Sequence, residues 1–162
     1  MTAALAARAR RLTGSEWRVL AESAALALVV EAALHLVPLA RILRAVERPI
    51  RTSVALDPAA AGRVARLARW PWRVLPLRGT CLRVALVQVA VLRRRQLPAV
   101  VRFGVHRAQD GELEFHAWAD CGGPIDDAAG AAVYRAFEPV PAAAISRSAR
   151  WSPPAAPPDV VA

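Results

Sequence analysis

One segment of the chain, Cys81–Arg95, is apolar on nearly every side of the helix that its residues favour. A helix without a polar face has to be surrounded by other elements, because any side left toward water would expose apolar side chains. Gly79 breaks the chain before it, and Thr80 is of a residue type that often caps a helix. The triplet Arg93–Arg95 fills the last turn, where the helix dipole favours positive charge and where water can solvate it. The segment therefore predicts a helix buried at the centre of a domain.

Three further helices are predicted before this one. The first begins near Ser15 and Glu16, and Pro38 ends or kinks it. Two shorter helices are expected over Leu39–Val46 and Pro58–Arg69. Apolar residues at helical spacing predict the buried face of the first helix, and they are Leu20, Ala24, Leu28, Ala32 and Leu36.

After Pro98 the pattern changes from helical to extended. Ala99–His106 has the composition of a strand, and Cys121–Gly123 is predicted as the loop to a returning strand over Pro124–Asp127. Helices followed by antiparallel strands predict an α+β fold, with the buried helix packed on a small sheet. Between the two strand segments, residues 113–120 alternate between an apolar face (Leu113, Phe115, Ala117, Ala119) and a second face (Glu114, His116, Trp118, Asp120).

Composition narrows the possible functions. The chain has 162 residues, the length of one domain, and a formal charge of +9 in which all 22 basic residues are arginine. The absence of lysine and asparagine is typical of a GC-rich genome, so the charge is weak support for a nucleic-acid partner. The arginines are scattered and no nucleic-acid motif is present, and we predict no such partner. Two cysteines exclude a disulfide scaffold, and without a metal motif or a phosphate loop we expect neither metal nor cofactor.

The most apolar stretch, Val19–Ala40, does not predict a membrane span. Glu22 and Glu31 interrupt it, and its uncharged pieces fall short of the roughly 20 residues that a spanning helix needs. Glu16 and Glu22 also fit a signal peptide poorly. We therefore expect a long core helix and a cytoplasmic protein.

Cys81 is a candidate nucleophile because it lies in the first turn of the predicted buried helix. Unpaired N–H groups and the positive end of the helix dipole favour a thiolate there, although an inert buried cysteine is common. His116 is the candidate base, since it faces away from the apolar side of its strand. A two-residue turn would place Asp127 opposite Trp118 on the face of His116, and a three-residue loop would place Asp126 there. Either carboxylate would orient the imidazole, although both are also compatible with solvated turn residues.

The order of these residues is that of transglutaminase-like and related papain-like cysteine-protease folds. The run from Thr80 to Asp127 resembles more closely the transglutaminase-like B proteins of lasso-peptide biosynthesis, which are related to the C-terminal half of the microcin-processing B protein. Gln96 stands where that family usually has glycine. The shared features are Cys81-Leu82, the arginines Arg93–Arg95, Gly104-Val105 and His116-Ala117-Trp118.

The resemblance implies a cysteine peptidase that removes the leader from a ribosomally made lasso precursor. It implies Cys81 as nucleophile, His116 as acid and base, Asp127 (or Asp126) as the third residue of the triad, and Trp118 beside the substrate. The implied partners are the precursor, a small leader-recognition protein, and an ATP-dependent lasso cyclase that closes the ring. Alone, this chain should bind its substrate poorly. The expected organisation is a helical segment over 1–50, a peptidase core over 51–145 and a Pro/Ala-rich disordered tail over 146–162.

Other functions remain open from the sequence. Acyl transfer to an amine, as in true transglutaminases, uses the same thioester chemistry. An arginine-rich scaffold that binds peptide or nucleic acid without chemistry belongs to a different class, and Cys81-dependent turnover would separate the two. A zinc site built from the cysteines and histidines lacks the usual paired spacing, and a Cys81–Cys121 disulfide is not expected in the cytoplasm.

Overall fold

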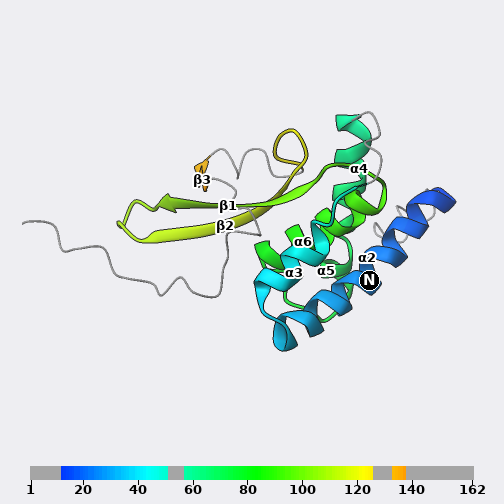
Figure 1. Cartoon of the computed structure of the whole chain (residues 1–162), viewed down its shortest axis with the longest axis horizontal. Coiled ribbons are helices and arrows are strands. Elements are labelled where there is room, and N and C mark those ends of the chain that lie inside the picture. Colours follow the sequence, from blue (N-terminus) through cyan, green and yellow to red (C-terminus); the bar gives the residue numbers. More distant parts are fainter. Residues whose placement is uncertain (1–11, 51–56, 126–132, 138–162) are drawn as a thin grey trace, which may run out of the picture.

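A computed structural model describes residues 12–50, 57–125 and 133–137 (Figure 1). The predicted α+β fold is confirmed, and the boundaries of the predicted helices and of the first two predicted strands agree with the structure to within one or two residues. The short helix α5 was not predicted, and the predicted tail over 146–162 lies outside the described residues. In chain order the elements are α2 (Gly14–Leu36), α3 (Leu39–Val46), α4 (Pro58–Ala68), α5 (Pro71–Val74), α6 (Cys81–Arg94), β1 (Val100–Arg107), β2 (Leu113–Asp120) and β3 (Arg135–Ala136).

Helix α6 lies at the centre of the fold, as its apolar sequence predicts. It packs against α2, α3 and α4 on the helical side and against β2 of the sheet. Its one buried polar side chain, Gln88, donates from Nε2 to the backbone oxygen of Ala65 in α4 at 3.1 Å, so its amide nitrogen is satisfied. The buried residues of α6 are Ala85, Leu86, Val87, Gln88, Val89, Val91 and Leu92.

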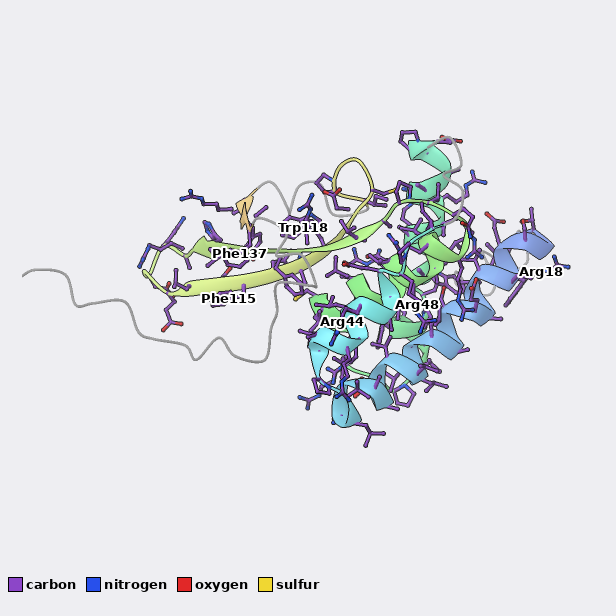
Figure 2. All side chains as sticks on the ribbon, in the orientation of Figure 1. Arg18, Arg44, Arg48, Phe115, Trp118 and Phe137 are labelled. Carbon is purple, nitrogen blue, oxygen red and sulfur yellow. The ribbon has the colours of Figure 1, made fainter. Side chains whose placement is uncertain are left out.

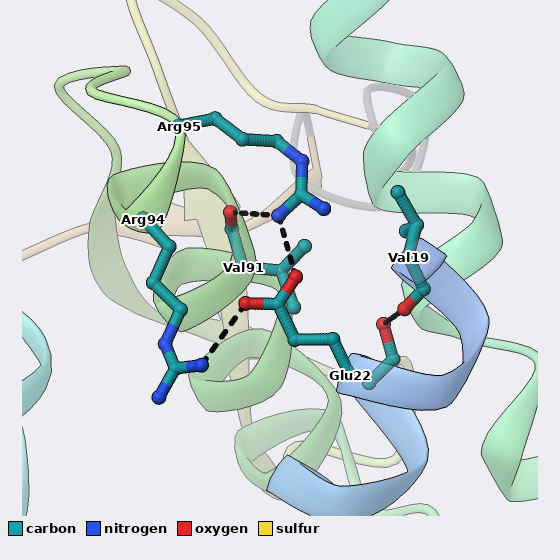
Figure 3. A network of polar contacts seen from close by, with 6 residues as sticks. Val19, Glu22, Val91, Arg94 and Arg95 are labelled. Atoms are coloured by element: carbon teal, nitrogen blue, oxygen red, sulfur yellow. Dashed lines mark hydrogen bonds and ion pairs between the residues drawn. The ribbon is translucent and has the colours of Figure 1, made fainter. Parts of the chain in front are cut away.

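Two carboxylates of α2 hold the two ends of α6. Near the start of α2, Glu22 accepts hydrogen bonds from Arg94 at 3.1 Å and from Arg95 at 2.8 Å (Figure 3). Near its end, Glu31 pairs with Arg83 in the first turn of α6 at 2.7 Å. The two helices are therefore antiparallel. The arginines at the end of α6, expected to be a solvated helix end, instead have protein partners.

The predicted buried face of α2 is wrong in part. Leu28 and Leu36 are 54% and 81% exposed. The helix is apolar on most sides, so the sequence pattern alone does not distinguish its faces. Glu31 follows Glu22 by nine residues, which is two and a half turns, so the two carboxylates border the buried face on opposite sides. That buried face consists of Val19, Leu20, Ser23, Ala27 and Val30.

Among the described residues, α2 is also the one helix that is long and apolar enough to cross a membrane. Its most apolar window has a mean hydropathy of 1.7, and 28% of that window is buried inside the structure. Core helices and signal sequences near an N-terminus have the same length and composition. The ion pairs of Glu22 and Glu31 with α6 make α2 part of the helical layer in this structure.

Arg93 joins three elements where α6 ends. Its guanidinium donates to the backbone oxygens of Ala99 at 2.8 Å and Glu47 at 3.0 Å, and also to that of Arg48. The carboxylate of Glu47 in turn accepts from the backbone N–H of Val101 at 2.8 Å. These bonds fix the start of β1 against the ends of α3 and α6.

The sheet is antiparallel, with strand order β2-β1-β3 among the described residues. The returning strand predicted over Pro124–Asp127 does not continue the sheet within the described residues: Pro124 makes one isolated bridge, with Asp120, and Asp126 and Asp127 lie outside them. The third strand pairs with β1 instead. Gly122 and Gly123 adopt φ angles of 76° and 146°, and this tight turn leads the chain away from β2.

Gln96, the residue after the arginine run, has an unusual backbone conformation. It follows the C-cap of α6 with a φ of 60°, a left-handed conformation that costs a non-glycine residue about 1 kcal/mol. Its Oε1 atom is buried and has no hydrogen-bond partner among the described residues. Gln96 therefore combines backbone strain with a buried oxygen that lacks a hydrogen-bond partner among the described residues.

We expect Gln96→Gly to raise the free energy of unfolding by about 0.5–1 kcal/mol, because relief of the strain and of the unpaired oxygen exceeds the entropy that glycine adds to the unfolded chain. Urea denaturation monitored by circular dichroism measures this change in the free energy of unfolding. Gln96→Ala is the control, since it removes the side-chain oxygen and keeps the strained φ. Equal midpoints for the Gly and Ala variants would contradict the explanation.

Candidate active site

Cys81 is the first residue of α6. Thr80 before it is extended (φ −71°, ψ 156°) and its carbonyl accepts the first helical bond, from the N–H of Val84 at 3.0 Å. The Thr80 side chain makes no capping hydrogen bond, so it leaves the first-turn N–H groups free of a side-chain cap. The Cys81 thiol is free and half-buried, and it packs against the hydrophobic core.

The turn before Cys81 is shaped by close packing on a tryptophan. A Cβ atom on Gly79 would lie 3.0 Å from the Cβ of Trp72, closer than side chains normally approach. Trp72 itself packs against the hydrophobic core. The glycine that the sequence marks as a chain break is thus also the residue that lets the start of α6 lie against Trp72.

His116 lies on β2, on the face that the sequence alternation predicts. Ala117 and Ala119 belong to the core, and Phe103 of β1, which pairs with Ala117, packs against it. Because successive side chains of a strand point to opposite faces, His116 lies on the other face of the sheet. Its cross-strand partner is Gly104.

Two aromatic rings are stacked with the imidazole of His116. The ring of Tyr134 lies 4.9 Å from it with 27° between the planes, and that of Trp118 lies 6.0 Å from it with 19°. Tyr134 donates from its hydroxyl to Glu114 at 3.3 Å and contacts His106 edge to face. Stacking restrains the plane of an imidazole while its two nitrogens remain at the ring's edge. Trp118 is 5% exposed, and its place beside a substrate stays a prediction.

Gly104 provides the space for this arrangement. A Cβ atom there would lie 3.0 Å from the ring of Trp118 and 3.0 Å from the backbone oxygen of Arg135 in β3. The glycine therefore lets both the tryptophan ring and the third strand approach β1 opposite His116. It is the glycine of the Gly104-Val105 pair noted in the sequence.

Tyr134 is the site residue that the sequence did not predict. It is the chain's single tyrosine, and it directly precedes the two-residue strand β3. No local pattern links it to His116, because the two are neighbours only through the pairing of β3 with β1. The one signal for Tyr134 in the sequence was that the chain contains a single tyrosine.

Cys81 and His116 lie on adjacent elements. The distance along α6 from Arg93 back to Cys81 is about 18 Å. The distance along β2 from Cys121 back to His116 is about 17 Å. Arg93 donates to the backbone oxygen of Ala99, and the next residue, Val100, pairs with Asp120 at the end of β2, so α6 and β2 end near one another. The structure groups the thiol with the helical core and the imidazole with Trp118 and Tyr134 on the other face of the sheet. The two candidate catalytic residues thus lie on neighbouring elements but on opposite faces of β2.

The remaining expected residues have different outcomes. Asp126 and Asp127 lie outside the described residues, so the third member of the triad stays a prediction. Cys121 is buried and free, and burial raises the pKa of its thiol, as does the charge of Asp120, against an opposing effect of Arg93. Within residues 12–50, 57–125 and 133–137, no group of three His, Cys, Asp or Glu side chains could hold a metal ion.

We expect iodoacetamide at neutral pH to modify Cys81 at least about tenfold faster than Cys121. The thiolate is the reactive form, and Cys121 is both buried and held neutral by its raised pKa. Peptide mapping by mass spectrometry over a time course measures the two rates. Under denaturing conditions the two cysteines should react alike. Faster modification of Cys121 in the folded protein would contradict this assignment.

Comparison with known proteins gives one family. The profile of the transglutaminase-like superfamily matches residues 24–142, well over half of the chain, and the match includes Cys81 and His116. No curated protein and no solved structure gives a significant match. This superfamily generally comprises cysteine peptidases and acyltransferases. The protein belongs to the transglutaminase-like superfamily.

Proposed function

We propose that this protein is a cysteine peptidase that removes the leader peptide from a lasso-peptide precursor. Membership of the transglutaminase-like superfamily supports cysteine chemistry of the peptidase or acyltransferase type. The observation that carries the proposal is the position of Cys81 as the first residue of the buried helix α6. The Cys-Leu, Gly-Val and His-Ala-Trp motifs shared with the lasso B proteins supply the substrate class.

In the proposed mechanism the Cys81 thiolate attacks the scissile carbonyl carbon. The developing oxyanion accepts a hydrogen bond from the backbone N–H of Cys81. When the peptide C–N bond breaks, protonated His116 gives its proton to the departing amine and a thioester remains. His116 then takes a proton from water, whose hydroxyl attacks the thioester and releases the carboxylate and the free thiol.

The surroundings of His116 suit this role. Trp118 and Tyr134 stack with its ring, and stacking restrains rotation of the imidazole between the two steps. An aromatic face also attracts the positive charge that the ring carries before it protonates the amine. We propose Asp127 (or Asp126) as the carboxylate that orients the ring, and Trp118 as the side chain that borders the substrate.

The proposal includes partners and a location. A small leader-recognition protein would present the precursor, and a separate ATP-dependent cyclase would close the ring after cleavage, all in the cytoplasm. No nucleic-acid partner is proposed. The three consecutive arginines at the end of α6 are bound to backbone oxygens and to Glu22 within the protein.

We expect Cys81→Ala to lower cleavage of a cognate lasso precursor, supplied with its leader-recognition protein, by at least about 10³-fold, because no other group can form the thioester. Cys121→Ala is the matched control and should stay within about twofold of wild type. Mass spectrometry of the released leader measures the rate and identifies the scissile bond.

The same assay separates the competing functions. Repeating it with an added primary amine distinguishes hydrolysis from acyl transfer, since a transferase would join the amine to the new carboxyl end. Intact precursor with folded, reduced wild-type protein would overturn the peptidase proposal. Equal cleavage by wild type and Cys81→Ala would overturn the role of the cysteine.

A further inference from the structure

The outer edge of β2 carries backbone groups that have no strand partner among the residues that the structure describes. Phe137 donates its N–H to the oxygen of Phe103 at 2.8 Å, so residue 103 directs its backbone groups at β3. Successive residues of an antiparallel strand direct their backbone N–H and C=O groups to opposite sides of the strand. Gly104 therefore directs its N–H and C=O at β2, where it pairs with His116. Phe115 and Ala117, on either side of His116, must then direct their N–H and C=O groups outward.

The end of β2 confirms this alternation. The oxygen of Ala119 accepts from the N–H of Ile125 at 2.9 Å on the outer side of the strand. Beyond that bond, in the part of the chain that the structure describes, no strand pairs with β2 on this side. The outward groups of Leu113, Phe115 and Ala117 form what we call the open edge. It spans the half of β2 that lies farther from the turn at Cys121.

The side chains along the open edge are apolar, and two of the three are exposed while Ala117 is buried. Leu113 and Phe115 are 54% and 68% exposed, although both lie on the sheet face that Ala117 and Ala119 bury against the helices. Figure 2 shows Phe115 on the part of the hairpin that extends beyond the helical layer. The open edge is therefore a short apolar surface continuous with the hydrophobic core.

Proteins normally protect such an edge from pairing with other chains. The usual devices are proline or lysine on the edge, a β-bulge, or a charged side chain pointing inward. The open edge has none of them: its outward residues are leucine, phenylalanine and alanine, and the register with β1 runs without interruption from Leu113 to Asp120. An unprotected edge of this kind is suited to bind an extended peptide by strand addition.

We propose that the open edge binds an extended segment of the peptide substrate as an added strand, with apolar substrate side chains at alternate positions on Leu113 and Phe115. This inference rests on the proposed function. The peptide is favoured as the occupant because the strand that would bind it also carries His116, and because β2 runs beside α6, the helix that begins with Cys81. Backbone pairing holds the chain extended, which is the conformation that exposes a scissile bond to a nucleophile.

Amide hydrogen exchange tests the pairing directly. We use the Cys81→Ala variant, to prevent cleavage, with a cognate lasso precursor and its leader-recognition protein. In the protein alone the amides of Phe115 and Ala117 should exchange faster than that of His116, which bonds to β1. With the precursor they should slow by at least about tenfold, while the amide of His116 changes little, because only the outward groups gain partners.

A proline variant tests the same contact by kinetics. Phe115→Pro removes one outward N–H, and proline is tolerated on an edge strand at such a position. Phe115→Thr is the matched control, since it also loses the ring and keeps the N–H. We expect KM for the precursor to rise at least about tenfold more in the Pro variant than in the Thr variant. Equal rates of Cys81 alkylation in both variants verify that the site is folded.

The outcomes separate this inference from the function on which it rests. Cleavage by wild type without slowed exchange at Phe115 and Ala117, or with equal KM in the Pro and Thr variants, overturns strand addition and leaves the peptidase intact. Slowed exchange at these two amides without cleavage by wild type supports the binding site and overturns the peptidase. If the amides of Phe115 and Ala117 already exchange slowly in the protein alone, a second copy or another segment of this chain occupies the edge. That result overturns the inference.

Discussion

The burial of α6 is the constraint on which the rest of the structure depends. Its side chains are apolar on nearly every side, so α2, α3, α4 and one strand of the sheet must all cover it. Only its ends can be polar, and both ends are held there by carboxylates of α2, through Arg83 at the start and Arg94 and Arg95 at the end. Cys81, at the start of this helix, packs against the core and lies beside the first-turn N–H groups.

The sheet has a second role because its hairpin extends beyond the helical layer (Figure 2). Near the helices β2 buries Ala117 and Ala119, and farther out the same face exposes Phe115. His116 lies between these two regions, on the opposite face, with Trp118 and Tyr134 stacked with it. One strand thus joins the core, the candidate acid–base residue and the open edge.

The sequence predicted much of the fold because its local signals agree with its packing. Proline, glycine and capping residues give the helix ends, and strict alternation in β2 gives the face of His116. Cys81 could be selected because its position needs only the start of one helix to be known. The departure at Gln96, where the resembled family usually has glycine, falls on a residue with a φ of 60°.

The sequence by itself determined which segments form helices and strands, which helix is central, and which face of β2 carries the histidine. These properties follow from periodicity and from residues close together in the chain. Only the tertiary structure decided which side of α2 is buried, because that helix is apolar almost all round and ion pairs with α6 select the face. It alone placed β3 on β1, and so Tyr134 on His116, because strand pairing between distant segments depends on long-range contacts that no local pattern encodes.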